Sequence, residues 1–241
     1  MPPLLTASGT AGAIVVGALA LAATGWPGLL LLFAFFLPSS LVSRVSRPPE
    51  GGLDPKGEQR DAWQVFANGL APSLGAALAA WAGALDLAWM ILLGGLSVAA
   101  ADTWATAIGS RSRRPPRHLL TGRTVPRGTN GGVTILGTIG AAAGALVVGF
   151  TALVGPAARP VLSAIIIGVA GMFLDAALGS ALQGRFHCER CDQPSEWPRH
   201  RCGNRTVLVG GIAWLTNDAV NAMATLAGAL AGAAWWALSP R

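Results

Sequence analysis

Residues 87–110 read LAWMILLGGLSVAAADTWATAIGS, and Asp102 is the one charged side chain among them. A helix needs roughly 20 apolar residues to cross a hydrocarbon core of about 30 Å, so this stretch is long enough to span a membrane. Residues 160–184 and 206–240 follow the same pattern, with Asp175 and Asp218 as their single charges. Stretches without any Asp, Glu, Lys or Arg are residues 7–23, 25–43, 62–85 and 131–158. The sequence therefore predicts an all-α, polytopic transmembrane helix bundle of about seven spans.

The composition of the whole chain agrees with a protein that folds in lipid. Only 12% of the residues are charged, which is about half of the proportion in soluble domains, and the mean hydropathy is +0.53. The first stretch lacks the basic residues that open a signal peptide, so we expect it to be retained as a helix. The connection at residues 44–60 is irregular and gives no sign of a second domain, so we expect residues 1–241 to form a single integral membrane domain.

The basic residues gather in alternate connections between the predicted spans. Fifteen of the 17 lie in three loops, at residues 44–60, 111–127 and 185–205. Loops rich in Arg and Lys face the cytosol. We therefore expect an integral membrane protein, in the cell membrane if it is bacterial, with its N-terminus and its functional groups on the cytosolic side. Topology alone accounts for many of these side chains; the alternative is that some of them bind an anion.

Three acids inside the predicted spans need an explanation, because a carboxylate at the centre of a membrane helix costs roughly 2.5 to 3.5 kcal/mol on insertion scales. We expect Asp102 and Asp175 about two turns, and Asp218 about three turns, from the cytosolic ends of their helices. One interpretation makes each acid an isolated, hydrogen-bonded packing residue. Their similar depth favours the other, in which Asp102, Asp175 and Asp218 are catalytic residues that bind Mg²⁺ through carboxylate oxygens.

Polar side chains recur at intervals of three or four residues near these acids, and such intervals place side chains on one helix face. They carry amide or guanidinium groups, which donate hydrogen bonds to phosphate oxygens. They are Arg60, Gln64 and Asn68 at the start of the third span, Gln183 after Asp175, and Asn217 and Asn221 around Asp218. We predict that they bind the phosphates of a nucleotide or a substrate.

A glycine-rich segment, Gly128-Thr129-Asn130-Gly131-Gly132, follows a loop that contains six Arg and no acid. Glycines permit backbone conformations that turn successive amides toward an anion. The segment also precedes the fifth span, and we expect it to open that helix, whose N-terminal dipole favours phosphate. A tight turn without a ligand is the alternative. Together with Arg123 and Arg127, the segment is predicted to bind phosphates.

The loop at residues 184–206 contains all three Cys of the chain. Cys188-x-x-Cys191, followed by His200 and Cys202, offers four ligands of the types that hold Zn²⁺ in tetrahedral sites. The spacing to the second pair is short, and free thiols are the alternative, because a disulfide is not expected in a cytosolic loop. The loop is therefore a candidate for a structural Zn²⁺ site.

Six segments, in their order and spacing, resemble the integral membrane phytyl-phosphate kinase family over nearly the whole chain. They are residues 61–69 (DAWQVFANG), 101–109 (ADTWATAIG), 128–134 (GTNGGVT), 174–183 (LDAALGSALQ), the Cys-x-x-Cys loop, and 214–221 (WLTNDAVN). The residue types at Asp102, Asn130, Asp175 and Asp218 agree with the family pattern. Thr216 departs from it, because relatives often have Asn at that position.

The resemblance implies transfer of a phosphoryl group from a nucleoside triphosphate, expected to be CTP, to a membrane-borne isoprenoid monophosphate. Mg²⁺ is the expected cofactor, and we expect no nucleic acid partner. The acceptor is already an anionic phosphate, so neutralising charge should matter more than general-base catalysis. Two alternatives remain: an ion-coupled transporter, since buried acids also mark ion paths, and another lipid-phosphate enzyme such as a cytidylyltransferase.

Overall fold

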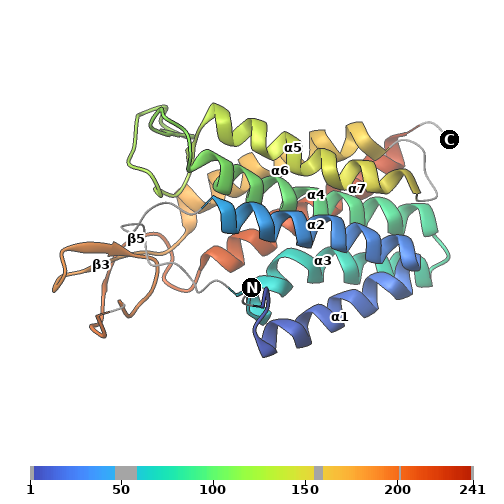
Figure 1. The fold of residues 1–241 in the computed structure, drawn as a ribbon, viewed down its shortest axis with the longest axis horizontal. Helices are drawn as coiled ribbons and strands as arrows, with labels where there is room; N and C mark the ends of the chain where they lie inside the picture. The colour runs from blue at the N-terminus through green and yellow to red at the C-terminus, as the bar shows by residue number, and fades with distance from the viewer. Residues whose placement is uncertain (1–2, 47–58, 155–159, 201, 240–241) are drawn as a thin grey trace.

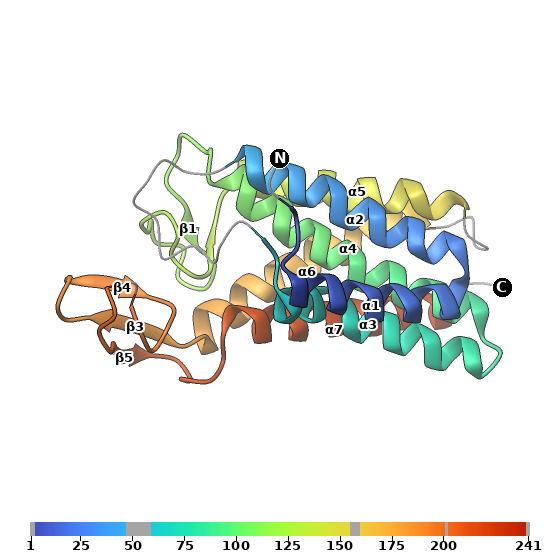
Figure 2. The same ribbon diagram turned by 60° about the horizontal axis from the view of Figure 1, so that its bottom comes forward.

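The computed structural model describes residues 3–46, 59–154, 160–200 and 202–239. These residues form seven α-helices that lie side by side in an elongated bundle, with short strands in two small sheets at one end (Figures 1 and 2). The last helix ends at the opposite end of the bundle from the sheets (Figure 1). Five basic residues of the sequence analysis lie outside the described residues: Arg47, Lys56, Arg159, Arg201 and Arg241.

Several of the helices begin directly after a residue whose side chain caps them. Thr6, Asp61 and Thr216 each accept a hydrogen bond from the backbone N–H three residues later, which satisfies one of the free donors at a helix start. The bounds are α1 Ala7–Thr24, α2 Trp26–Val45, α3 Ala62–Trp81, α4 Leu85–Gly109, α5 Ile135–Thr151, α6 Pro160–Leu182 and α7 Asn217–Leu238, with a short 3-10 helix, η1, at Ala152–Val154.

Two connections at the same end of the bundle contain the strands (Figure 2). Between α4 and α5, β1 (Arg117–His118) pairs antiparallel with β2 (Gly132–Val133). Between α6 and α7, β3 (Arg185–Cys188) lies between β4 (Gln193–Ser195) and β5 (Val207–Gly210), and both are antiparallel to it. Both connections are basic loops of the sequence analysis. That they face the cytosol stays a prediction.

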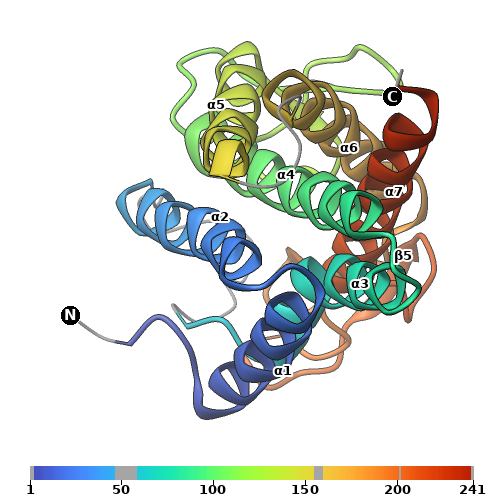
Figure 3. The ribbon, with the colours of Figure 1, turned by 90° about the vertical axis from the view of Figure 1, so that its right-hand side faces the viewer.

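Helix α4 lies at the centre of the bundle and packs against α2, α3, α5, α6 and α7 (Figure 3). Its residues 92–101 are all buried. Gly94 lies so close to α7 that a Cβ there would overlap the carbonyl oxygen of Gly228. Such close approach of backbones is how small residues hold membrane helices together, where lipid offers no hydrophobic drive for association.

Gly232→Ala tests this packing. A Cβ at position 232 would overlap the carbonyl oxygen of Met90 in α4, and a backbone atom cannot rotate away. We expect a loss of about 1–3 kcal/mol in the free energy of unfolding, measured by chemical unfolding in detergent and circular dichroism. Gly17→Ala is the matched control, since the nearest atom to its Cβ would be Leu29 Cδ2 at 3.7 Å. Equal unfolding midpoints for the two variants would contradict the close contact between α4 and α7.

The predicted fold class, an all-α polytopic membrane bundle, is confirmed. Within the described part of the chain, four helices are long and apolar enough to cross a bilayer: α1, α2, α4 and, within α6, Val161–Leu182. Helix α5 is apolar but shorter. Seven spans therefore remain a prediction, although each helix overlaps one of the predicted stretches.

The last predicted span, residues 206–240, is wrong at its start. Helix α7 begins at Asn217, because Val207–Gly210 pair with β3 instead. A short apolar run rich in Val suits a strand as well as a helix, and its periodicity does not separate the two. Gly211, with a φ of +72°, then breaks the chain direction before α7.

Candidate active site

Asp102 and Asp175 face each other across the interface of α4 and α6. Each acid lies seven residues before the end of its helix, about two turns, as predicted. The two helices run side by side in register: a Cβ on Gly171 would overlap the Val98 side chain, four residues before Asp102. The two carboxyl groups come within hydrogen-bonding distance of each other. The structure therefore brings these two predicted residues together.

Asp175 also has a buried oxygen without a donor. Its Oδ1 is inaccessible to solvent and receives no hydrogen bond from an N–H or O–H group of the described residues. A buried carboxylate oxygen without a partner costs free energy, and two carboxylates in contact repel each other. A proton or a bound cation between Asp102 and Asp175 removes both costs.

Asp218 lies at the start of α7 and not three turns into the helix, which corrects the sequence prediction. The first eleven residues of the predicted span form β5 and the turn that follows it. Helix α7 is fixed to α3 by a buried hydrogen bond from Thr225 Oγ1 to the Ala67 carbonyl, 2.8 Å long. Asn221 is one turn before Thr225, and Asp218 is two turns before it, so both lie on the helix face toward α3. Asn217 is exposed at the first residue of the helix.

The polar side chains at the start of α3 form hydrogen bonds within that helix and its cap. Gln64 Oε1 accepts a hydrogen bond from the Asp61 amide at 3.1 Å, and Asp61 Oδ1 accepts one from the Gln64 amide at 2.9 Å. This reciprocal pair is a capping box. Asn68 Nδ2 donates to the Gln64 carbonyl at 2.8 Å. Gln64 is therefore part of the helix start. The spacing Asp-x-x-Gln before an apolar run is the signal that identifies this role.

Arg60 directs its side chain onto helix α2. Its guanidinium lies 5.4 Å from the ring centroid of Phe35 and 5.7 Å from that of Phe36, which is within the range of cation–π attraction. Burial lowers the pKa of Arg60 to about 10, so the side chain stays charged at neutral pH. Phe35 is one turn before Ser39, whose hydroxyl accepts a hydrogen bond from Trp104 Nε1 at 3.2 Å. The Arg60 charge is thus about one helical turn from the level of Asp102.

The glycine-rich turn packs against α6 at Ala176 and Ser180. Gly131 has a φ of +76°, and a Cβ there would overlap Ser180 Cβ and lie 3.0 Å from the carbonyl oxygen of Ala176. Within the turn, Thr129 and Gly132 use their amides in local hydrogen bonds. The amides of Asn130 and Gly131 have no acceptor within the described part of the chain. Two free amides therefore lie in a turn that contacts α6, the helix that carries Asp175, and such amides suit an anion.

The turn does not open α5, contrary to the sequence prediction. Strand β2 lies in between, and the helix begins at Ile135 after Thr134, whose hydroxyl accepts a hydrogen bond from the Gly137 amide at 2.9 Å. Gly132 belongs to β2, held by its antiparallel pairing with β1. The first turn of α5 is therefore capped by a side chain two residues after the last of these glycines.

Of the remaining residues predicted to bind phosphate, some already form hydrogen bonds within the described part of the protein and one does not. Arg127 donates to the carbonyls of Ser110 and Ser112, where it satisfies acceptors at the end of α4, so its guanidinium has a structural role here. Arg123 is exposed, and no described residue is a partner of its side chain. Gln183 is buried and reaches Glu196 in the Cys-containing loop, with Nε2 3.5 Å from Oε1. Sequence reasoning missed Glu196.

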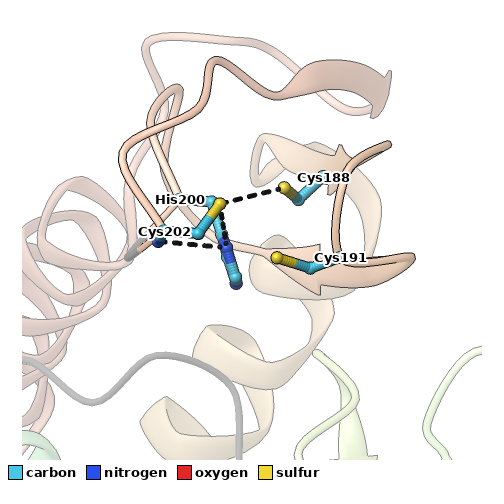
Figure 4. Close-up of side chains that lie close together, drawn as sticks. All are labelled: Cys188, Cys191, His200 and Cys202. Atoms are coloured by element: carbon cyan, nitrogen blue, oxygen red, sulfur yellow. Dashed lines mark hydrogen bonds between the residues drawn. The ribbon is translucent and has the colours of Figure 1, made fainter.

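The four residues predicted as zinc ligands gather in the Cys-containing loop (Figure 4). The ligand atoms of Cys188, Cys191, His200 and Cys202 all lie within 4.8 Å of one another. The hydrogen bond with His200 lowers the pKa of the Cys202 thiol to about 6, and the thiolate is the form that binds metals.

Comparison with known proteins identifies the family of the chain. Residues 3–229 match the family described as integral membrane protein DUF92. The chain belongs to this family. An uncharacterized membrane protein of Methanocaldococcus jannaschii is 31% identical over 178 residues, which cover 73% of each chain. An uncharacterized membrane protein of Synechocystis is 28% identical over 94% of this chain and 80% of its own. Protein PGR of Arabidopsis thaliana is 29% identical over 81% of this chain and 77% of its own.

No solved structure matches the chain. The family resemblance seen in the sequence motifs is confirmed, and the chain is an integral membrane protein. The descriptions of this family and of these three relatives name no reaction, nucleotide or substrate.

Proposed function

We propose that this protein is a CTP-dependent kinase that phosphorylates a membrane isoprenoid monophosphate, phytyl or another prenyl, to the diphosphate. The observation that carries the proposal is the pair of acids Asp102 and Asp175, which meet between α4 and α6, while the turn with the free amides of Asn130 and Gly131 packs against α6 at Ala176 and Ser180. Carboxylates beside anion-binding amides are the two halves of a site for a metal-bound phosphate.

The acid pair fits Mg²⁺. This cation prefers one or two protein carboxylates together with phosphate oxygens and water, and the unpartnered Oδ1 of Asp175 is such a ligand. Asp102 and Asp175 would hold the ion, and Asp218, at the start of α7, lies toward the basic end of the bundle from them. Bound there, Mg²⁺ would neutralise the charge that develops on the transferring phosphoryl group.

The nucleotide phosphates would bind at the glycine-rich turn. The Asn130 and Gly131 amides would donate hydrogen bonds, and Arg123 would supply positive charge from the exposed side of the loop. Gly131 touches α6 at Ala176 and Ser180, so a phosphate on these amides would lie on the helix that carries Asp175. The positive φ of Gly131 and its overlap with Ser180 explain why the turn requires glycine at that position.

The acceptor would place its phosphate near Arg60. The guanidinium lies on the rings of Phe35 and Phe36 and remains charged at neutral pH. A lipid monophosphate carries a charged head and an apolar tail, and this arrangement offers a cation for the head and apolar helix surface for the tail.

The chemistry is a transfer between two phosphates. An oxygen of the lipid monophosphate attacks the γ-phosphorus of CTP, the bond to the β–γ bridging oxygen breaks, and that oxygen leaves with the electron pair on CDP. The acceptor oxygen is anionic at neutral pH, so no side chain needs to remove a proton. The residues of the site act by holding the two anions in line and balancing their charge.

The test uses the full chain purified in detergent with CTP labelled at the γ-phosphate, Mg²⁺, and prenyl monophosphates of several chain lengths including phytyl. We expect the label in a lipid diphosphate, with one CDP formed for each. Release of pyrophosphate and a CMP-linked lipid would instead identify a cytidylyltransferase. If every lipid leaves the labelled CTP unchanged, the kinase proposal fails.

A further inference from the structure

Two chain turns meet in the connection between α6 and α7, and each brings two metal-binding side chains. Cys188 ends β3, and Cys191 lies in the tight turn to β4, where Cys188 pairs with Gln193. His200 and Cys202 lie in a second turn, closed by the hydrogen bond from the Gly203 amide to the His200 carbonyl at 2.8 Å. Figure 4 shows the sulfur atoms and the imidazole turned toward a common centre.

We propose that Cys188, Cys191, His200 and Cys202 bind a structural Zn²⁺ that clamps the connection between α6 and α7. In a tetrahedral site with bonds of about 2.3 Å to sulfur and 2.0 to 2.1 Å to nitrogen, neighbouring ligand atoms are roughly 3.5 to 3.8 Å apart. Cys188 Sγ and Cys202 Sγ are 3.6 Å apart, and His200 Nδ1 is 3.2 Å from Cys202 Sγ. The ligand shell is therefore close to the size that the ion requires.

The ligand types select zinc over the common alternatives. Three thiolates and one imidazole are soft or borderline donors, which disfavours Mg²⁺ and Ca²⁺. All four coordination positions are filled by side chains, which is the pattern of a structural site, whereas a catalytic site keeps one position open for water. His200 is buried and faces the thiols with Nδ1, so this nitrogen is the ligand.

The connection has little else to hold it together. Among its described residues, the buried side chains within the sheet and turns are few: Phe186, Cys188, Ser195 and His200. So small an apolar cluster cannot offset the entropy of ordering some twenty residues, and small units of this kind are usually completed by a metal or by disulfides. A bound Zn²⁺ would supply that free energy.

The proposed zinc site is connected through hydrogen bonds to α6 and α7, the helices that carry Asp175 and Asp218. At the base of the sheet, the Gly184 amide donates to the Leu215 carbonyl at 3.0 Å, and the Ile212 amide donates to the Leu182 carbonyl at 2.9 Å. These bonds join the end of α6 to the lead-in of α7. A metal that fixes the sheet above them also fixes the relative position of the two helix ends.

The first experiment measures metal content in the full chain, purified in detergent under reducing conditions from cells grown with zinc. We expect about one zinc per chain by mass spectrometry of the elements, and loss of most of it in Cys188→Ser and in Cys202→Ser. His187→Ala is the matched control: His187 is next to Cys188 but points to Asp192, with Nε2 3.1 Å from Oδ1. This variant should keep its zinc.

The second experiment uses the wild-type chain only, so a variant that misfolds cannot obscure the result. Chelation of zinc should speed trypsin cleavage after Arg190, in the Cys-containing loop, by roughly tenfold or more, and added Zn²⁺ should restore protection. Cleavage after Arg113, which is exposed in the connection between α4 and α5, should not change. Both readouts are independent of the proposed kinase activity.

Four results would overturn the zinc site. They are wild-type protein with only trace zinc, Ser variants that keep full zinc, a stoichiometric iron content in place of zinc, and a Cys188–Cys202 disulfide as the main form in the reduced preparation.

Discussion

Asp102→Asn and Asp175→Asn should each lower the rate of lipid diphosphate formation by about 100-fold or more, the loss typical of removing one group that stabilises transition-state charge. Asn has nearly the same size as Asp, so packing between α4 and α6 should survive. It lacks the negative charge that a cation requires, so Mg²⁺ would bind weakly. The double variant should be little worse than either single one, because residues that act as a unit lose their effect together.

Asp86→Asn is the matched control for these variants. Asp86 is in the same helix as Asp102 but in the first turn, exposed at the opposite end of the bundle. Its substitution should leave activity and unfolding unchanged. Raising the Mg²⁺ concentration should partly rescue Asp102→Asn, which a purely structural defect would not allow. Full activity in both Asn variants would remove the acid pair from the site.

The helices and the acid pair could be predicted because membrane insertion leaves strong signals in sequence. A charge-free stretch of about 20 residues predicts a membrane helix, and this prediction depends little on the tertiary contacts of the stretch. A costly acid in such a stretch then stands out, and counting residues to the helix end gives its depth. This reasoning placed Asp102 and Asp175 correctly, since both helices end near their last apolar residue.

The same reasoning failed where local hydrogen bonds determine the role of a side chain. The sequence of the loop does not distinguish Arg127 from Arg123, yet Arg127 caps the end of α4 and Arg123 is exposed. Position 218 was misplaced because the apolar residues of β5 resemble a helix start. The role of Gln64 could have been recognised, because a capping box has a sequence signature. The contact of Gly131 with α6 is a tertiary contact, and a single sequence gives no signal for it.

Arg60→Ala should raise the KM for the lipid monophosphate and lower kcat/KM for it by about 30-fold, as expected when one partner of a close, partly buried charge pair is removed. The KM for CTP should change little. The backbone of Arg60 holds the start of α3 through hydrogen bonds with Leu4 and Thr6, and these do not need the side chain. The unfolding midpoint should therefore stay close to that of the wild type.

Two further variants separate recognition from general electrostatics. Arg60→Lys keeps the charge but loses the flat guanidinium that lies on Phe35 and Phe36, so it should recover only part of the affinity. Arg113→Ala removes an exposed charge from a basic loop at the same end of the bundle and should have no effect on either KM. If Arg60→Ala raised both KM values equally, the side chain would serve the shared site and not the acceptor. Arg60 lies just before α3 with its guanidinium on two rings of α2, so an acceptor phosphate that enters between these two helices would meet this charge, and the split between the two KM values tests that route.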